Sequence, residues 1–577
     1  MEIKLGDLVF RSETKCVLKS ETLCPILEGE VSEYRLRLEF PEAIMPATYR
    51  LLWDEPQIDE LGFWPPTSGH WPNLRPDWSM SHADSRTASG MPLACVYNKQ
   101  NINRVTVALS DPANPTVLHA GVVEETGSLR LCVELFAQSC APMESYEITI
   151  RVDRRPIPFY DAVVSVRDWW RSIGYKETYV PDAAKLPVYS TWYSFHQYTY
   201  PEEIIAECAV AKAMGMDTVI VDDGWQTDDN SRGYAFCGDW KICGTKIPSM
   251  KDFVDRIHAL GMKFMIWFSV PFVGFESKNY ERFKGKYLFS RSWSRASILD
   301  PRFPEVRKFL VDTYCDYVKE YGWDGLKLDF IDSFRLADES PVDYENMDTI
   351  SLEEAVEKLL AEATAQLKAI NPEFMIEFRE SYVGPIVARY GNMFRVTDCP
   401  NDPFVNRVDS VGLRLTSGSI AVHSDMIMWN DNEKNEAVMY QLLAALFTVP
   451  QISVRFGKIT EDHKKLLANY LSFWRAHRDT LVNGKIEATD AEANYSSVTA
   501  KGKDENVCVL HQSIVMPITD QTTYLFNATG KDYVYVEMEN GGLCEMYDLF
   551  GNKCREIALP KGLAKINLDN CCMAKIR

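Results

Sequence analysis

A lysine and an aspartate two residues apart end a short apolar run at Gly325–Asp329. Side chains two apart on a β-strand share one face, so Lys327 and Asp329 lie side by side if this run is a strand. A neighbouring cation keeps a carboxylate ionised and able to attack an electrophilic carbon. We therefore interpret Asp329 as a nucleophile. The alternative is a structural role as a helix cap.

A second acidic motif consists of the adjacent Asp222 and Asp223, which are followed by Gly224 and Trp225. Adjacent carboxylates repel each other, so both stay ionised only where each accepts hydrogen bonds. The two hydroxyls of a sugar diol are suitable donors. We predict a substrate-binding role for this pair, with a helix cap beside a solvated aspartate as the alternative.

A third charged segment, residues 394–402, supplies Arg395, Asp398 and Asp402. A retaining glycosidase needs two carboxyl groups about 5 to 5.5 Å apart, one ionised to attack and one protonated to donate to the leaving oxygen. Asp398 and Asp402 both qualify as the second carboxyl group. A salt bridge between Asp398 and Arg395 is the structural alternative.

Other residues could complete such a site. Arg379 follows the predicted fifth strand, and Trp267 ends the third. Trp192 and Trp225 could supply a wall for the apolar face of a sugar, although for each aromatic candidate, Trp267 included, core packing is nearly as good an interpretation. For His423 and Asp425 a satisfied interior hydrogen bond is the better interpretation.

All these candidates fall at the ends of strands in a repeated strand–helix pattern. We predict strands at 186–192, 218–222, 263–268, 325–329, 374–378, 392–397, 419–423 and 451–454, and helices at 201–214, 250–260, 304–321, 352–370, 433–447 and 461–478. Parallel strands in a (β/α)8 TIM barrel bring their carboxyl ends to one face. The pattern therefore predicts a catalytic barrel over residues 186–483 with the candidates at its mouth.

Residues outside the barrel are rich in short β-type segments. Residues 1–180 are predicted to form an N-terminal β-sandwich, and residues 484–577 a small C-terminal antiparallel β domain. Segment 62–90, with Trp64, Trp71 and Trp78, is predicted to be a long loop that is either functional or a packed lid. One hypothesis is that it reaches the active site of a neighbouring copy in a homo-oligomer.

Composition excludes several classes of partner. The formal charge is −20 and the pI about 5.1, without a basic patch, which argues against binding nucleic acid or anionic membranes. The N-terminus lacks the apolar run of a secretion signal and no stretch approaches 18 apolar residues, so we expect a cytoplasmic protein. Fifteen cysteines at irregular spacing indicate reduced thiols. With no H-E-x-x-H pattern among nine histidines, we expect no metal and no cofactor.

With these residues assembled, the chain resembles the α-galactosidases of glycoside hydrolase family 36, which are melibiase-like and belong to clan D. The resemblance covers the three-domain layout and is strongest over residues 188–432. Its most specific segments are residues 221–225, 238–240, 246–248, 299–301, 325–329 and 394–398. One departure is residues 377–384, where many members carry a glycine-rich run with a cysteine, so a remodelled pocket for the sugar's 2-substituent is expected.

The resemblance implies roles for individual residues. Asp329 would be the nucleophile, and Lys327 would contact sugar hydroxyls. Asp222 and Asp223 would hold the 4- and 6-hydroxyls of galactose. Two further implied contacts are Arg395 near the 2-hydroxyl and Trp267 in the pocket wall, with Asp398 as the acid/base and Asp402 as its competitor.

The sequence thus predicts a retaining, exo-acting α-galactosidase that acts on carbohydrate. Alternatives on the same scaffold are an α-N-acetylgalactosaminidase and an α-galactosyl transglycosylase. A rival of another class is a glycan-binding protein without catalysis.

Overall fold

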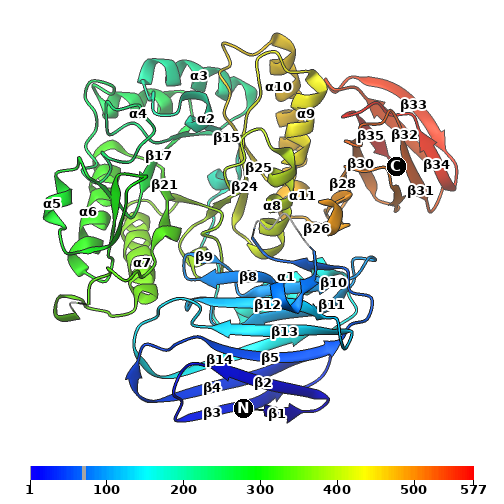
Figure 1. Cartoon of the computed structure of the whole chain (residues 1–577). Coiled ribbons are helices and arrows are strands. Elements are labelled where there is room, and N and C mark those ends of the chain that lie inside the picture. The colour runs from blue at the N-terminus through cyan, green and yellow to red at the C-terminus, as the bar shows by residue number, and fades with distance from the viewer. Residues whose placement is uncertain (1, 68–72, 343) are drawn as a thin grey trace.

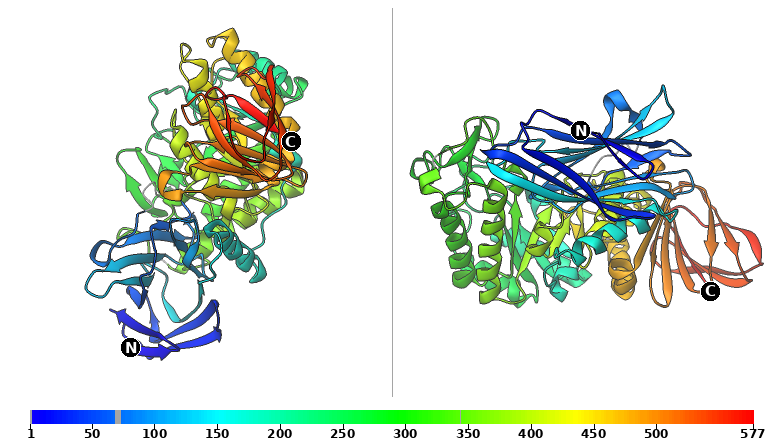
Figure 2. Two further views of the ribbon diagram at one scale, coloured as in Figure 1. Left: turned by 90° about the vertical axis from the view of Figure 1, so that its right-hand side faces the viewer. Right: turned by 90° about the horizontal axis from the view of Figure 1, so that it is seen from below.

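The computed structural model describes residues 2–67, 73–342 and 344–577. Figure 1 shows three parts: a blue to cyan β-sandwich, a green to yellow barrel ringed by helices, and an orange to red β domain at the C-terminus. Figure 2 shows the sandwich and the C-terminal domain attached to different sides of the barrel. The predicted (β/α)8 TIM barrel with flanking β domains is confirmed.

Eight parallel strands close into the central barrel. In order around the barrel they are β15 (Val188–Ser190), β16 (Thr218–Val221), β17 (Lys263–Ser269), β21 (Gly325–Asp329), β22 (Met375–Arg379), β23 (Met393–Arg395), β24 (Ala421–Ile427) and β25 (Val449–Ile452). Pairing of β15 with β25 completes the ring. The helices around it are α2 (Trp192–Phe195), α3 (Pro201–Met214), α4 (Met250–Ala259), α6 (Pro304–Tyr321), α7 (Leu352–Ile370), α8 (Pro403–Thr416), α9 (Asn435–Ala444), α10 (Glu461–Ala476) and α11 (Arg478–Asn483).

Local sequence signals fix the position of β21, the strand that carries Asp329. Helix α6 begins with Pro304 in its first turn and ends at Gly322, whose φ of 75° is left-handed. Gly325 then opens the strand, where a Cβ would lie 2.6 Å from the carbonyl oxygen of Met375 on β22. The two strands can therefore pair closely only because this residue is glycine.

The barrel interior changes character along its axis. An apolar layer contains Val188, Ile220, Met265, Met375, Met393 and Ala421. Farther along the same strands the buried side chains become polar, with Lys327, Glu377, Arg395, His423 and Gln451. This polar layer lies toward the carboxyl ends of the strands, which is the end where barrel enzymes keep their chemistry.

A small sheet is inserted between β17 and α6. It consists of β18 (Phe272–Gly274), β19 (Tyr287–Arg291) and β20 (Ala296–Leu299), with helix α5 (Asn279–Arg282) between the first two strands. Strands β19 and β20 form an antiparallel hairpin whose turn contains Trp293. The sequence pattern did not predict this insertion.

Two antiparallel sheets form the N-terminal sandwich. One contains β1 (Glu2–Leu5), β2 (Leu8–Thr14), β5 (Tyr49–Pro56), β13 (Ser128–Leu135), β12 (Thr116–Val123), β8 (Ser81–Arg86) and β9 (Ser89–Gly90), with β7 (Arg75–Pro76) parallel to β12. The other contains β3 (Ser20–Leu27), β4 (Val31–Ile44), β14 (Met143–Asp153), β11 (Asn103–Leu109), β10 (Leu93–Tyr97) and β6 (Gly62–Trp64). Helix α1 (Phe159–Ser172) follows and leads into the barrel.

Segment 62–90 is not the long loop that was predicted, because strands β6 to β9 and a short 3-10 helix (Asp77–Ser79) lie within it. Trp64 is 4% exposed and its indole nitrogen donates to the Tyr495 hydroxyl of the same chain at 2.9 Å. Trp64 therefore cannot extend to a neighbouring copy. Trp78 is exposed, and Trp71 lies outside the described residues.

The C-terminal domain also has two sheets. The larger contains β26 (Lys485–Thr489), β27 (Ser497–Lys501), β28 (Glu505–Leu510), β30 (Thr522–Asn527), β35 (Met573–Ile576), β32 (Gly542–Tyr547) and β33 (Lys553–Leu559). The smaller contains β29 (Val515–Ile518), β31 (Val534–Met538) and β34 (Gly562–Ile566). Most neighbours are antiparallel, as predicted, but β28 pairs with β30 and β29 with β31 in parallel.

One hydrophobic cluster extends through all three parts, while the sandwich and the C-terminal domain each have a further core of their own. The shared cluster contains Leu93 and Trp64 of the sandwich, Phe394 of the barrel and Val498 of the C-terminal domain. Among the described residues, no helix is long and apolar enough to cross a membrane.

Candidate active site

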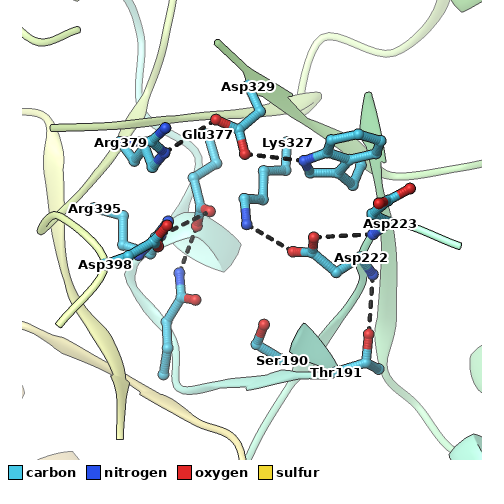
Figure 3. A network of polar contacts seen from close by, with 12 residues as sticks. Ser190, Thr191, Asp222, Asp223, Lys327, Asp329, Glu377, Arg379, Arg395 and Asp398 are labelled. Atoms are coloured by element: carbon cyan, nitrogen blue, oxygen red, sulfur yellow. Dashed lines mark hydrogen bonds and ion pairs between the residues drawn. The ribbon is translucent and has the colours of Figure 1, made fainter. Parts of the chain in front are cut away.

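Asp329 is the last residue of β21 and lies at the mouth of the barrel (Figure 3). Its Oδ1 atom accepts hydrogen bonds from Arg379 Nε at 3.0 Å, from the backbone N–H of Phe330 at 2.8 Å, and from the Tyr382 hydroxyl. Its Oδ2 atom accepts one bond, from Trp267 Nε1 at 3.0 Å. Oδ1 is thus saturated with donors, whereas Oδ2 keeps a lone pair for chemistry.

These donors and charges control the ionisation of Asp329. Burial alone would raise the pKa of this carboxyl, because removal from water disfavours the charged form. The charges of Arg379 and Lys327 and the hydrogen bonds from Tyr382 and Trp267 outweigh burial and hold the pKa well below its usual range. Asp329 is therefore ionised throughout the physiological pH range, as a nucleophile must be.

Lys327 lies on the same strand and pairs with Asp222 at the tip of β16. Its Nζ atom is 2.6 Å from Asp222 Oδ2, and both side chains are almost fully buried. Burial would lower the pKa of the ammonium, but the charge of Asp222 outweighs burial and raises it. The other oxygen of Asp222 accepts the backbone N–H of Asp223 at 2.9 Å. Lys327 is therefore a fixed cation between two carboxylates.

Asp223 turns away from this pair and is held by two amides. Gln197 Nε2 and Gln226 Nε2 each donate to one of its oxygens at 2.6 Å. Burial is the dominant effect and raises the pKa of Asp223 to about 6, because the two amides compensate it only in part. The turn requires Gly224, whose φ is 115° and where a Cβ would lie 2.5 Å from Gln197 Cα.

Arg395 on β23 connects the floor of the site to its rim. Its guanidinium is fully buried and donates to Asp425 on β24 and, through Nη2, to Asp398 Oδ1 at 2.8 Å. The side chain of Asp398 itself is 45% exposed. Partial burial of the carboxyl group raises its pKa, but the charge of Arg395 outweighs burial and lowers the pKa of Asp398 in the ligand-free protein. Because the side chain is partly exposed, solvent screens some of this charge effect.

Asp329 and Asp398 face a common space. Figure 3 shows them with Arg379, Lys327 and Asp222 arranged around one space at the barrel mouth. Lys327 and Asp329 share β21, and each of the others comes from a different barrel strand or the loop that follows it. The charge of Arg379 acts on both carboxyl groups. The arrangement therefore offers an ionised carboxylate and a second, solvent-accessible carboxyl group on either side of one ligand.

A buried polar layer supports this mouth from below. Glu377 on β22 lies within 3.6 Å of Arg395 and accepts a hydrogen bond from Gln451 Nε2. His423 faces the same amide at 3.3 Å, and its other ring nitrogen lies 2.8 Å from the carbonyl oxygen of Ala184. Burial lowers the pKa of His423 to about 4, so this ring is neutral at pH 7. The layer fixes Arg395 without adding a further charge from histidine.

Two candidates lie apart from the cavity. Trp225 is fully buried, donates its indole N–H to the carbonyl oxygen of Trp267 at 2.9 Å, and stacks on Trp240. Asp402 is the N-cap of α8 and accepts from the backbone N–H groups of Phe404 and Val405 at 3.0 and 3.1 Å. The structure thus gives both of them local structural contacts, and the geometry favours Asp398 over Asp402 as the second carboxyl group.

Seven of the other candidates are brought together: Asp222, Trp267, Lys327, Asp329, Arg379, Arg395 and Asp398. Asp223 follows Asp222 in the chain, but its carboxylate is turned toward Gln197 and Gln226. Sequence analysis missed Tyr382, Glu377 and Gln197. A tyrosine three residues beyond Arg379 was the only available signal for the first. Among the described residues, no group of three or more His, Cys, Asp or Glu side chains is placed to hold a metal ion.

The family model and the curated relatives that match this chain point to the same protein family. Residues 178–357 match the melibiase family model. The α-galactosidase Mel36A of Lactobacillus acidophilus is 29% identical over 133 residues, which are 20% of this chain and 17% of that protein. The bifunctional α-galactosidase/sucrose kinase AgaSK of Mediterraneibacter gnavus is 34% identical over 131 residues, which are 20% of this chain and 13% of that protein. The aligned stretches thus span less than a fifth of these relatives.

Solved structures share the whole fold. A family 36 α-galactosidase, AgaA of Geobacillus stearothermophilus, in complex with 1-deoxygalactonojirimycin, aligns with a TM-score of 0.65 at 14% identity, covering 100% of this chain and 82% of that chain. Variants of the same enzyme were solved in complex with stachyose and with raffinose. At this identity the likeness concerns the fold.

Proposed function

We propose that this chain, whose residues 178–357 belong to the melibiase family, is a retaining, exo-acting glycoside hydrolase that releases terminal α-linked galactose. The observation that carries the proposal is the pair of carboxyl groups on one cavity. Asp329 is held ionised by four donors, and Asp398 is solvent-accessible on the loop after β23. Double displacement requires two such carboxyl groups, one that stays ionised and one that carries a proton when the substrate is bound.

In the first step, Asp329 Oδ2 attacks the anomeric carbon of the sugar. The bond from that carbon to the leaving oxygen breaks, and this oxygen takes a proton from Asp398. The product is a galactosyl ester of Asp329. Arg379, Tyr382 and the Phe330 N–H, which all contact Oδ1, hold the carboxylate in position for attack.

In the second step, water replaces the leaving group. Asp398 takes one proton from water, the oxygen bonds to the anomeric carbon, and the ester bond to Asp329 breaks. The carboxylate leaves readily because the same three donors stabilise its charge. Both acids return to their starting protonation states, and galactose is released with its anomeric configuration retained.

Asp398 must gain a proton before the first step, although Arg395 lowers its pKa in the empty site. A sugar bound in the cavity excludes water from the exposed part of this carboxyl, and desolvation raises the pKa of an acid. We propose that substrate binding itself brings Asp398 to its acid form.

The remaining residues would bind the sugar. Asp222 and Lys327 offer an acceptor and a donor side by side, which suits two neighbouring hydroxyls. Asp223 provides a further acceptor. The faces of Trp267 and Tyr234, which are stacked with ring centroids 6.3 Å apart, provide an apolar wall.

The test uses variants of the two acids with azide as an external nucleophile. Asp329→Gly should be inactive on nitrophenyl α-galactoside and, with azide, form β-galactosyl azide, since azide attacks from the side the carboxylate left. Asp398→Asn should instead give α-galactosyl azide through the covalent intermediate. Full activity of Asp329→Gly without azide refutes the proposal.

The same assay separates the alternatives. Turnover of the 2-acetamido analogue in place of nitrophenyl α-galactoside would indicate an α-N-acetylgalactosaminidase. Formation of oligosaccharides with added acceptor sugars would indicate transfer. Stoichiometric glycan binding without any turnover would indicate a binding protein.

A further inference from the structure

A chain of aromatic rings connects the candidate nucleophile to the protein surface. Trp267, which donates to Asp329, stacks on Tyr234 at an interplanar angle of 25°. Tyr234 in turn contacts the edge of Trp293, with centroids 6.5 Å apart. Trp293 lies in the turn between β19 and β20 and is 70% exposed. An indole so exposed beside a sugar site provides a stacking surface that the protein interior does not use.

Three arginines surround the same region, and we call them the arginine rim: Arg86, Arg291 and Arg335. The guanidinium of Arg291 lies 5.9 Å from the Trp293 ring and 5.2 Å from that of Phe289. Arg335 lies 5.1 Å from the same Phe289 ring. The rim thus forms one cluster from the sandwich, the inserted hairpin and the loop after β21.

That loop anchors the rim next to the nucleophile. Arg86 donates to the carbonyl oxygens of Asp332 and Phe334, both at 2.5 Å, and Arg291 Nη1 donates to Ser333 Oγ at 3.1 Å. Asp332 is only three residues beyond Asp329. The rim therefore lies outside the sugar cavity but adjacent to it.

None of the three arginines has a carboxylate in ion-pair contact among the described residues, although most buried or clustered arginines elsewhere in the barrel do. The charges of Asp332 and Glu353 act on Arg86, and that of Asp332 also acts on Arg291. Asp332 Oδ1 is buried and has no hydrogen-bond partner in the part of the chain that the structure describes. In a chain of net charge −20, these three clustered guanidiniums, which form no ion pair within the described ranges, make a local concentration of positive charge.

Clustered cations are costly without a compensating anion. Burial lowers the pKa of Arg86 and of Arg291, which shows that their surroundings leave part of this cost uncompensated. Arg291 is half-buried and Arg335 exposed, so both can contact a ligand, whereas the bonds of Arg86 are occupied by the loop. A guanidinium binds carboxylate and sulfate oxygens through paired N–H donors.

We propose that Trp293 with Arg291 and Arg335 forms a subsite for the leaving-group sugar and that this subsite selects a sugar bearing an anionic group, a carboxylate or a sulfate ester. The inference rests on the proposed galactosidase activity, in which the terminal galactose fills the cavity and the next sugar lies outside it. Trp293 stacks on the ring of that sugar, and the two arginines bind its acidic substituent.

The test compares three α-1,4-linked galactosyl disaccharides that differ only at carbon 6 of the reducing sugar: galactose, galacturonic acid and galactose 6-sulfate. Nitrophenyl α-galactoside serves as the substrate without a second sugar. We expect kcat/KM for at least one of the acidic disaccharides to exceed that for the neutral one about fivefold to tenfold at low salt. The preference should shrink in 0.5 M NaCl, because salt screens exposed charges.

Variants assign the preference to individual residues. Arg291→Ala and Arg335→Ala should each reduce the ratio of acidic to neutral kcat/KM toward one, and Trp293→Ala should raise KM for all three disaccharides. Arg282→Ala is the matched control, because Arg282 belongs to the same insertion but pairs with Glu305 at 3.4 Å. This control should keep both the ratio and the activity on nitrophenyl α-galactoside.

The results distinguish failure of the anionic-sugar subsite from failure of the galactosidase activity. Equal or better turnover of the neutral disaccharide by the unmodified protein overturns the subsite, as does a preference that survives both arginine substitutions. A preference for the carboxylate alone or for the sulfate alone identifies the anionic group. Lack of any activity on nitrophenyl α-galactoside would instead refute the galactosidase proposal itself.

Discussion

Replacement of Tyr382 by phenylalanine tests how the protein keeps Asp329 ionised. The substitution removes one hydroxyl and leaves the ring, so the volume and the stacking of Arg379 on this ring at 5.1 Å are retained. Asp329 Oδ1 loses one of its three donors and keeps Arg379 and the Phe330 N–H. The variant therefore removes one hydrogen bond to the candidate nucleophile, together with the 3.3 Å bond that the same hydroxyl accepts from the Phe330 N–H.

The expected effect follows from the strength of that bond. A hydrogen bond to a charged group contributes about 1.5 to 3 kcal/mol, which corresponds to a pKa change of about 1 to 2 units. The pKa of Asp329 is held well below its usual range, so the variant should raise it toward that range. Attack needs the ionised form, and the acidic limb of kcat/KM should move up by about 1 to 2 pH units.

The substitution should also lower the free energy of unfolding. A depressed folded-state pKa stabilises the protein above the unfolded pKa of about 3.9, and this contribution is lost as the pH falls through the folded value. Tyr382→Phe should therefore be less stable than the unmodified protein at neutral pH, and the gap should narrow in acid.

The assay is a pH profile of kcat/KM on nitrophenyl α-galactoside together with thermal unfolding. Tyr390→Phe is the matched control, since the Tyr390 hydroxyl contacts Glu357 at 2.8 Å and no group of the active site. Its acidic limb should not move. If Tyr382→Phe folds normally and its acidic limb coincides with that of the control, the hydroxyl does not set the ionisation of Asp329 and the reasoning fails.

Three further substitutions test the other acids. Asp398→Asn should reduce kcat/KM on a disaccharide about 10²- to 10⁴-fold but much less on a dinitrophenyl galactoside, whose leaving group needs no proton; equal losses on both would reject the acid role. Asp402→Ala should cost about 0.5 to 2 kcal/mol of stability through loss of the α8 cap while kcat/KM is kept, and a loss of activity like that of Asp398→Asn would reverse the assignment. Asp223 has a raised folded-state pKa of about 6, so the fold loses stability between the unfolded pKa of about 3.9 and about pH 6, where the unfolded chain releases the proton more readily. Asp223→Asn should remove this pH dependence and abolish sugar binding, and a melting temperature that falls between pH 4 and 6 as steeply as that of the unmodified protein would contradict this.

Much of the barrel was predictable because its elements carry local signals. Helix α6 has the predicted bounds, 304–321, since proline in the first turn and a left-handed glycine after the last mark both ends. Strand tips such as Asp329 were predictable because alternation and a charged end residue are local patterns. The ends of β23 and β24 were less well predicted, since their pairing depends on distant neighbours.

Local signals also misled the interpretation at α8. The sequence Asp402-Pro403 is a capping residue followed by proline in the first helical turn, which together mark the start of a helix. From the sequence, Asp402 was interpreted only as a candidate catalytic or binding residue, and no helix was predicted after it. A capping pattern beside a catalytic motif therefore needs both interpretations.

Other functional residues were not predictable from local sequence. Tyr382 reaches Asp329 only because the turn after β22 brings the two together across 53 positions of the chain. Arg291 and Arg335 become neighbours only when the inserted hairpin folds beside the loop after β21. Such contacts depend on tertiary structure, for which a single sequence has no periodic signal.

The contact of Arg86 with the carbonyls of Asp332 and Phe334 has a practical consequence for anyone who shortens or recombines this protein. Through Arg86, the sandwich holds the backbone that follows Asp329 in place. The hydrophobic cluster that spans the three parts extends from Trp64 to Val498. Excision of the barrel would expose the apolar surfaces where it meets the sandwich and the C-terminal domain, and it would remove the hydrogen bonds from Arg86. Exchange of the chain's ends for those of a distant relative should accordingly reduce turnover before it disturbs the helices of the barrel.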